Sequence, residues 1–271
     1  MGGIGELVAA NGIDIYTERR GEGPRLLFLN GSTQTLERMG LLLDVLVSRF
    51  DVLAHDQRGL GRTSVPPGPY DMADYAADAA AVLDHAGWDT ARVVGISFGS
   101  MVAQELAVTW PERIERLALL CTSPGGAGGS SYPLHELIDV PDADRTAIYL
   151  PLLDTRFTPD WLASNDRDRA VAEQLAARRN DMANRPPEQV RGEREQLLAR
   201  SLHDVTDRLG RITCPTLVAA GRYDGIAPPA NSKAIASRIP GAELRMYEGG
   251  HTFIAQDRAA IPEIMDFLAA D

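Results

Sequence analysis

The chain has 271 residues, of which 44% are hydrophobic, and its formal net charge at pH 7 is −11. This length fits one large α/β domain with room for an inserted subdomain. The negative charge argues against nucleic acid and anionic membrane surfaces as partners, because their phosphates would repel it. The sequence has no apolar run of about 18 residues, as a transmembrane helix needs, and its start lacks the features of a signal peptide. We therefore expect a cytoplasmic protein.

Strand and helix signals alternate in the first part of the chain. Asn11-Gly12 lies between two apolar segments, which is a strong signal for a β-hairpin. The predicted strands are residues 7–10, 13–18, 25–30, 52–55, 91–94 and 114–121, and the predicted helices are residues 36–47, 70–86 and 100–109. This alternation predicts an α/β fold with a mostly parallel, doubly wound sheet that helices cover on both faces.

The segment 123–211 interrupts this alternation. It contains Gly-Gly pairs, several prolines and short charged segments with helical spacing, but no strand signal of comparable quality. Strand signals return at residues 215–220 and 242–247, and helix signals return at residues 230–238 and 259–269. We therefore predict a core formed by residues 1–122 and 212–271, with a helical lid of residues 123–211 inserted after the sixth strand.

The two cysteines, Cys121 and Cys214, lie at the edges of apolar strand-like runs. Buried reduced thiols are therefore a better interpretation than a disulfide or a redox pair. Histidine, cysteine and carboxylate residues form no cluster with metal-ligand spacing, so we expect neither a metal nor an organic cofactor.

The most informative motif is Gly95-Ile96-Ser97-Phe98-Gly99, which follows a predicted strand and precedes a predicted helix. A strand, a tight turn with a serine and a helix form the nucleophile elbow of serine hydrolases. A glycine-rich turn with a surface serine is the alternative, because so short a motif also arises by chance. The elbow interpretation requires a base, an acid and an oxyanion site elsewhere in the chain.

His251 and Asp224 are the expected base and acid. Each follows one of the last two predicted strands, and the carboxyl ends of parallel strands are where such sheets carry their sites. Asp224 could hold the imidazole in one tautomer, although an Asp-Gly turn is the simpler explanation of Asp224-Gly225. His55 also lies at the end of a predicted strand, but it lacks the flexible glycine loop that precedes His251. The remaining histidines lie in a predicted helix or in the predicted lid.

An oxyanion hole needs two backbone N–H groups near the nucleophile. Phe98, directly after the serine, should supply one of them. Ser32, in the loop after the strand 25–30, should supply the other.

The catalytic candidates occur in the order Ser97, Asp224, His251, and with these motifs the chain resembles the α/β-hydrolase fold superfamily. The resemblance covers nearly the whole chain and rests on five elements in order: Asn30-Gly31, the run from Asp56 to Ser64 with Arg58-Gly59 and Gly61, Gly95–Gly99, Gly221-x-x-Asp224, and Gly249-Gly250-His251. Within the superfamily it is similar to the 3-oxoadipate enol-lactonase and cofactor-free haloperoxidase-like esterase group. Many members have histidine where this chain has Asn30, but the backbone donors of the loop should remain.

The resemblance implies a serine hydrolase that cleaves a small ester or lactone through an acyl-enzyme. C–C bond hydrolysis, perhydrolysis or acyl transfer by the same triad remain alternatives, as does a ligand receptor with slow turnover. Substrate choice would lie in the lid, where arginines such as Arg156 or Arg185 could bind a carboxylate. The lid residues expected to line an apolar pocket, or alternatively to pack the lid onto the core, are Tyr132, Tyr149, Phe157, Trp161 and Met182. A monomer and a homodimer both fit the sequence.

Overall fold

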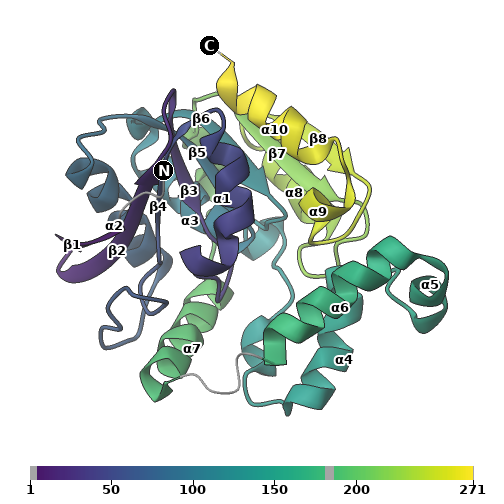
Figure 1. The fold of residues 1–271 in the computed structure, drawn as a ribbon. Helices are drawn as coiled ribbons and strands as arrows, with labels where there is room; N and C mark the ends of the chain where they lie inside the picture. The colour runs from purple at the N-terminus through teal and green to yellow at the C-terminus, as the bar shows by residue number, and fades with distance from the viewer. Residues whose placement is uncertain (1–4, 181–185, 271) are drawn as a thin grey trace.

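A computed structural model describes residues 5–180 and 186–270 of the chain. Its centre is an eight-stranded sheet with the strand order β1-β2-β4-β3-β5-β6-β7-β8 (Figure 1). The strands are β1 (Glu6–Ala10), β2 (Ile13–Arg20), β3 (Arg25–Leu29), β4 (Asp51–His55), β5 (Ala91–Ile96), β6 (Ile114–Leu120), β7 (Thr216–Gly221) and β8 (Glu243–Tyr247). The strands from β3 to β8 pair in parallel, whereas β2 is antiparallel to both β1 and β4. The predicted doubly wound α/β architecture is confirmed.

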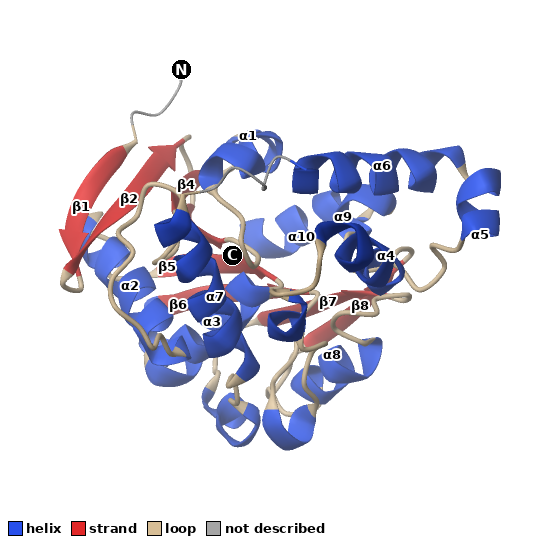
Figure 2. Ribbon diagram, turned by 90° about the horizontal axis from the view of Figure 1, so that it is seen from below, coloured by secondary structure: helices blue, strands red, loops and turns tan. Residues whose placement is uncertain are grey.

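Helices cover both faces of the sheet, as Figure 2 shows. The helices are α1 (Gly40–Val47) and α10 (Ala260–Ala269) on one face, and α2 (Met72–His85), α3 (Phe98–Thr109) and α8 (Pro229–Ala236) on the other. The side chains of β3 alternate between the two cores: Leu26 and Phe28 pack with α1 and α10, whereas Leu27 and Leu29 pack with α2 and α3. A strand buried on both faces explains why residues 25–29 are continuously apolar.

Most predicted boundaries agree with the structure to within one or two residues. The predicted helix 36–47 is instead a short 3₁₀ turn, η1 (Leu36–Met39), followed by α1. The helix predicted to begin at residue 70 begins at Met72, because Asp71 caps it. The Asp71 side chain accepts from the backbone N–H of Asp74, and the Asp74 side chain accepts from that of Asp71.

A helical insertion follows β6 and precedes β7. It contains α4 (Asp142–Leu153), α5 (Pro159–Ser164), α6 (Asp166–Asn180) and α7 (Pro187–Ser201), which lie together beyond one end of the sheet (Figure 1). A small apolar cluster of Leu134, Leu137, Leu153, Leu197 and Ile226 packs α4 and α7 against the loop after β7. The insertion therefore lies at the edge of the sheet where the parallel strands end.

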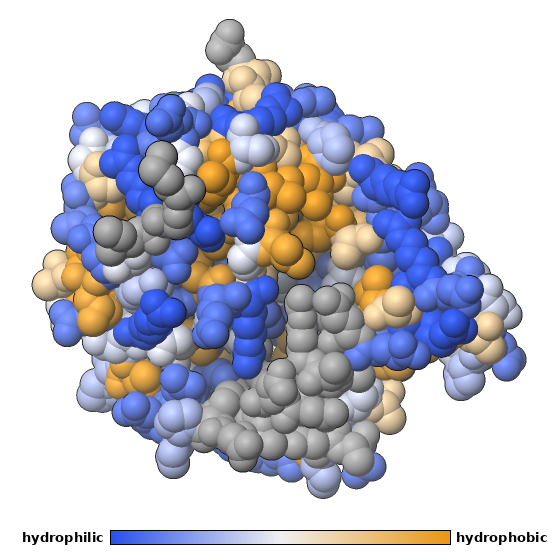
Figure 3. Space-filling model, in the orientation of Figure 1, coloured by the Kyte–Doolittle hydropathy of each residue, from blue (hydrophilic) through white to orange (hydrophobic). Residues whose placement is uncertain are grey.

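The surface carries a few large apolar side chains on α1. Figure 3 shows hydrophobic side chains gathered around α1 and α10, and Leu41 of α1 is 78% exposed. Within residues 5–180 and 186–270, the structure contains no helix with the length and apolar character needed to cross a membrane.

Candidate active site

Ser97 lies at a strained turn between β5 and α3. Its backbone has φ +54° and ψ −112°, a conformation that residues with a side chain rarely adopt. Two contacts with the end of β6 hold it: the Ser97 N–H donates to Leu120 O at 2.8 Å, and the Thr122 hydroxyl donates to Ser97 O at 3.2 Å. The turn therefore places Ser97 directly after β5 and at the N-terminus of α3.

The two glycines of the motif are required by close backbone packing. A Cβ atom on Gly95 would lie 2.5 Å from the carbonyl oxygen of Gly99. A Cβ atom on Gly99 would collide with the carbonyl oxygen of Leu29 and would lie 2.5 Å from that of Asn30. No real Cβ contact is this short, so the spacing Gly-x-Ser-x-Gly follows from how tightly α3 crosses β3 and β5.

His251 joins Ser97 to Asp224. Its Nε2 atom lies 2.9 Å from Ser97 Oγ, and its Nδ1 atom lies 2.8 Å from Asp224 Oδ2. The other carboxylate oxygen of Asp224 accepts the backbone N–H groups of Ile226 and Ala227, both at 2.8 Å. With its proton on Nδ1, the imidazole donates to the carboxylate, and Nε2 is free to accept the serine proton. The structure thus brings together the three residues that the sequence singles out.

The loop that carries His251 is fixed by the insertion. A Cβ atom on Gly250 would collide with the carbonyl oxygen of Leu153 at the end of α4. The Gly250 N–H donates to Gln256 Oε1 at 2.9 Å, and Gln256 Nε2 donates to Asp154 Oδ2 at the same distance. The position of the imidazole therefore depends on the end of α4 as well as on β8.

The predicted oxyanion donors lie on both sides of the serine. Phe98 is the first residue of α3, and Gly31 of the other loop is so close that a Cβ there would lie 3.8 Å from Ser97 Cβ. Among the residues that the structure describes, neither the Ser32 nor the Phe98 backbone N–H has a hydrogen-bond acceptor. Both donors are therefore available to a ligand.

The loop after β3 is held from two sides. Gln57 Nε2 donates to the carbonyl oxygen of Asn30 at 2.6 Å, and Gln196 of α7 accepts the N–H of Thr33 at 2.7 Å. The Asn30 side chain is completely buried, and its amide atoms have no partner among the described residues. The backbone of the loop is thus held by Gln57 and Gln196 and not by the Asn30 side chain. No pattern in the sequence predicts the role of Gln196.

The other histidines have environments that do not fit a base for Ser97. Burial lowers the pKa of His55 to about 4 and, together with the charge of Arg208, that of His203 to about 3. His85 is half-exposed and lies 3.4 Å from Glu6. Within the described parts of the chain, His251 is the histidine that hydrogen-bonds to Ser97.

Cys121 is buried at the end of β6, where burial and the charge of Asp224 raise the pKa of its thiol. Cys214 is also a free thiol, but it is half-buried rather than buried. Among the residues described here, no group of three or more histidine, cysteine and carboxylate side chains could hold a metal ion.

The expected substrate-binding residues occupy different places in the insertion. Tyr132 and Tyr149 pack on the apolar cluster beside Ile226, and Phe157 is buried. Trp161 is engaged elsewhere: its indole N–H donates to Asp168 at 2.8 Å, and the Arg156 guanidinium lies 4.9 Å from its ring. Met182 and Arg185 lie outside the described residues. Tyr132 thus bonds to the loop of Asp224 through the carbonyl oxygen of Ile226, and the Arg156 guanidinium also lies 3.9 Å from the ring of Tyr223 in that loop.

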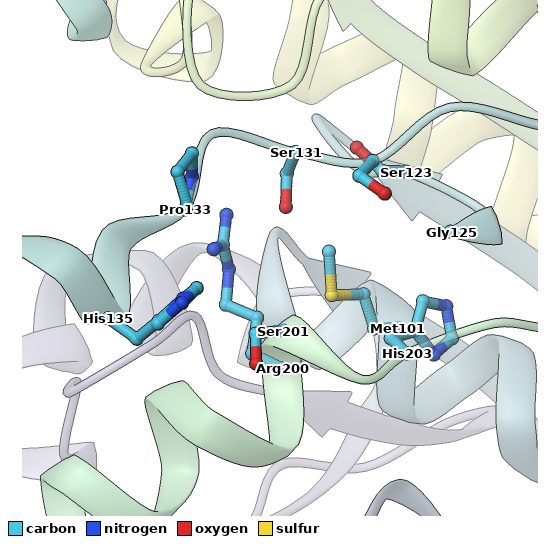
Figure 4. A pocket seen from close by; sticks show the side chains of 10 residues that line it. Met101, Ser123, Gly125, Ser131, Pro133, His135, Arg200, Ser201 and His203 are labelled. Carbon is cyan, nitrogen blue, oxygen red and sulfur yellow. The ribbon is translucent and has the colours of Figure 1, made fainter.

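Arg156, one of the two arginines considered as carboxylate ligands, is paired within the protein. Its guanidinium donates to both oxygens of the buried Asp154, at 2.9 and 2.7 Å. A different arginine, Arg200 of α7, is 3% exposed and lines a cavity of about 100 Å³ (Figure 4). The sequence did not single out Arg200, because it is one of several arginines in a highly charged helix.

Comparison with known proteins agrees with this architecture. A family model described as alpha/beta hydrolase fold matches residues 24–257. The chain is 31% identical to a poly(3-hydroxyalkanoate) depolymerase from Ectopseudomonas oleovorans, over 90% of this chain and 83% of the relative. It is 26% identical to 3-oxoadipate enol-lactonase 2 from Acinetobacter baylyi, over 88% of this chain and 86% of the relative. The structure of a hydrolase from Pseudomonas aeruginosa is 30% identical with a TM-score of 0.80, covering 98% of both chains.

Proposed function

The chain belongs to the alpha/beta hydrolase fold family, and we propose that it is a serine hydrolase that cleaves a small carboxylic ester or lactone through an acyl-enzyme. The observation that carries this proposal is the pair of hydrogen bonds at His251, whose Nε2 accepts from Ser97 and whose Nδ1 donates to Asp224. The relatives support it by their names, which describe a depolymerase and an enol-lactonase.

In the first step, Ser97 Oγ attacks the substrate carbonyl carbon while His251 Nε2 takes the hydroxyl proton. Asp224 stabilises the imidazolium that forms, and it is held in place by the N–H groups of Ile226 and Ala227. The negative charge that develops on the carbonyl oxygen is stabilised by the free N–H groups of Ser32 and Phe98.

In the second step, the tetrahedral intermediate collapses and the bond to the leaving oxygen breaks. His251 returns its proton to that oxygen, which leaves as an alcohol, or as the hydroxyl end of the same molecule when the substrate is a lactone. A water molecule then gives its proton to His251 and attacks the acyl carbon. Release of the acid restores the Ser97 hydroxyl.

We propose that residues 123–211 act as a lid on a core of residues 1–122 and 212–271. This division is supported by the contacts of α4 and α7, which reach the loops of His251, Asp224 and Ser32. A segment in contact with all three loops is well placed to shape the pocket above Ser97 and to select the substrate.

The experiment is hydrolysis of a panel of nitrophenyl esters and lactones by the wild-type protein and by Ser97→Ala, with β-diketones included to detect C–C cleavage. We expect turnover of esters or lactones by the wild type and a loss of several orders of magnitude in kcat for Ser97→Ala. Rapid mixing should show a burst of nitrophenolate if deacylation is the slower step. Ester turnover that survives in Ser97→Ala would contradict the proposal.

A further inference from the structure

Arg200 is a buried cation with unused hydrogen-bond donors. Its Nη1 atom donates to the carbonyl oxygen of Tyr132 at 2.8 Å. Its Nε and Nη2 atoms are buried and have no acceptor among the described residues. A buried donor without an acceptor costs free energy, and a buried charge without a partner costs more, so this arrangement is suited to an anionic ligand.

Arg200 lines the cavity of about 100 Å³. Figure 4 shows the guanidinium between Ser131 and Pro133 on one side and His135 on the other. None of the described residues that line this cavity is an aspartate or a glutamate. Among the described residues, the cavity therefore has no carboxylate in its lining that could neutralise Arg200.

The charge states of the cavity favour an anion at neutral pH. Burial lowers the pKa of Arg200 to about 10, so its guanidinium is still protonated at pH 7. His203, which also lines the cavity, is neutral there because its pKa is lowered to about 3. The protein carboxylate whose charge acts on Arg200 is Asp224, but its oxygens already accept from His251, Ile226 and Ala227.

Hydrogen-bonded residues connect the lining of the cavity to the Ser97 site. A chain of hydrogen bonds runs from Arg200 to Tyr132 O, from Tyr132 N–H to Ile226 O at 2.7 Å, and from Ile226 N–H to Asp224. On the other side, Met101 lines the cavity and its backbone N–H bonds to Ser97 O at 3.2 Å. A substrate held at Ser97 could thus extend a second functional group towards Arg200.

We propose that Arg200 binds a carboxylate of the substrate, so that the ester or lactone attacked by Ser97 carries a free acid group. The Nε–H and Nη2–H groups form the edge of a guanidinium that pairs with both oxygens of a carboxylate. This inference rests on the proposed function, because it names the substrate class of the same site.

The test compares pairs of substrates that differ in one charge. The nitrophenyl monoesters of glutaric, adipic and pimelic acid each carry a free carboxylate, and the same compounds with that carboxylate methylated do not. For the wild type we expect kcat/KM to be about ten- to hundredfold higher for the acid of at least one pair, as one charge-assisted bidentate contact would give. Equal values for every pair would overturn the proposal.

Two variants assign the preference to Arg200. In Arg200→Met the ratio of kcat/KM between acid and methylated substrate should fall close to one. Arg200→Lys should keep part of the ratio, because it retains the charge but loses the planar fork. Arg194→Met is the matched control, since Arg194 lies on the same helix, is half-exposed and pairs with Asp139. An unchanged ratio in both Arg200 variants would overturn the proposal.

A binding measurement separates this inference from the proposed function. Adipate should raise the Tm of Ser97→Ala, its dimethyl ester should not, and the shift should disappear in Ser97→Ala/Arg200→Met. If neither member of any substrate pair is turned over, the proposed function is contradicted. The Tm shift caused by adipate then tests by itself whether Arg200 binds a carboxylate. The absence of any shift would then overturn the carboxylate site as well. If Arg200→Met does not fold, the proposal is tested by the ratio of kcat/KM between acid and methylated substrate in the wild type and in Arg200→Lys.

Discussion

The side chain of Gln196 accepts a hydrogen bond from the backbone N–H of Thr33 at 2.7 Å and so ties α7 to the loop after β3. Gln196 is completely buried, and Thr33 has a positive φ of 59°, a strained conformation that needs support. Ser32, whose N–H we assign to the oxyanion hole, directly precedes Thr33. The insertion that we propose as a lid therefore also holds part of the proposed catalytic apparatus.

Replacement of Gln196 by leucine should lower kcat about tenfold on a nitrophenyl ester, with a smaller effect on KM. The side chain keeps its approximate volume, but the Thr33 N–H loses its acceptor and the loop no longer holds the Ser32 donor in place. Steady-state kinetics provide the measurement. Gln189→Leu on the same helix is the control, because the Gln189 side chain donates to the carbonyl oxygen of Gly61, at 3.4 Å. A kcat equal to that of the wild type would show that the contact is not needed.

Replacement of Gly250 by alanine should reduce activity about a hundredfold or more while the protein remains folded. The added Cβ atom would collide with the carbonyl oxygen of Leu153, and relief of this contact must move either His251 or the end of α4 that positions it. Gly40→Ala is the matched control, because Gly40 has an ordinary helical φ and open space around its Cβ position. Equal activity of the two variants would argue against a fixed His251 loop.

Asp224→Asn should lower kcat by about three to four orders of magnitude, with little change in size or packing. The amide can still accept from Ile226 and Ala227, but its NH₂ group would favour the tautomer that protonates Nε2, which cannot then accept from Ser97. Asp207→Asn, an exposed position, provides the control. Near-complete activity in Asp224→Asn would mean that another residue orients His251.

The free energy of unfolding should decrease as the pH falls from about 6.5 to about 4, in part because of His55. The folded protein keeps His55 neutral, with a pKa of about 4, whereas the unfolded chain takes up the proton near 6.5. Between these values the unfolded state binds more protons, so stability is present above pH 6.5 and is lost towards pH 4. The loss should approach about 1 kcal/mol per pH unit for this one group.

Urea denaturation of the wild type and of His55→Gln at several pH values measures this effect. The variant should show a smaller slope of unfolding free energy against pH in this range, whatever its stability at pH 7. His85→Gln is the control, because His85 is half-exposed. Parallel slopes for wild type and His55→Gln would refute the assignment of the acid sensitivity to the buried imidazole.

The sequence predicted the core well because its signals there are local. Asn11-Gly12 predicts a hairpin from these two residues alone. Gly95 and Gly99 are spaced as they are because a Cβ atom at either position would collide with backbone atoms at the strand-to-helix turn. Ser97, Asp224 and His251 each follow a parallel strand, and the carboxyl ends of parallel strands lie at the same edge of the sheet. The positions of these three residues in the sequence were therefore sufficient to predict that they lie close together.

The insertion was harder to interpret because its chemistry depends on which side chains turn inward. Helix α7 carries charged residues on all sides, so its sequence does not reveal that Gln196 and Arg200 are buried while Arg194 is not. Trp161 was expected in a substrate pocket because it is large and aromatic. In the structure its indole N–H donates to Asp168 and its ring lies beside the Arg156 guanidinium, and no local pattern in the sequence predicts these two partners.

The central claim is that Ser97 is the nucleophile, and covalent labelling tests it most directly. The protein is treated with a fluorophosphonate, which reacts with activated serine hydroxyls, and the product is analysed by intact-protein and peptide mass spectrometry. We predict one adduct per chain on the peptide that contains Ser97, a strongly reduced rate in His251→Ala and no adduct in Ser97→Ala. An unlabelled wild-type protein, or an adduct that persists in Ser97→Ala, would contradict the account.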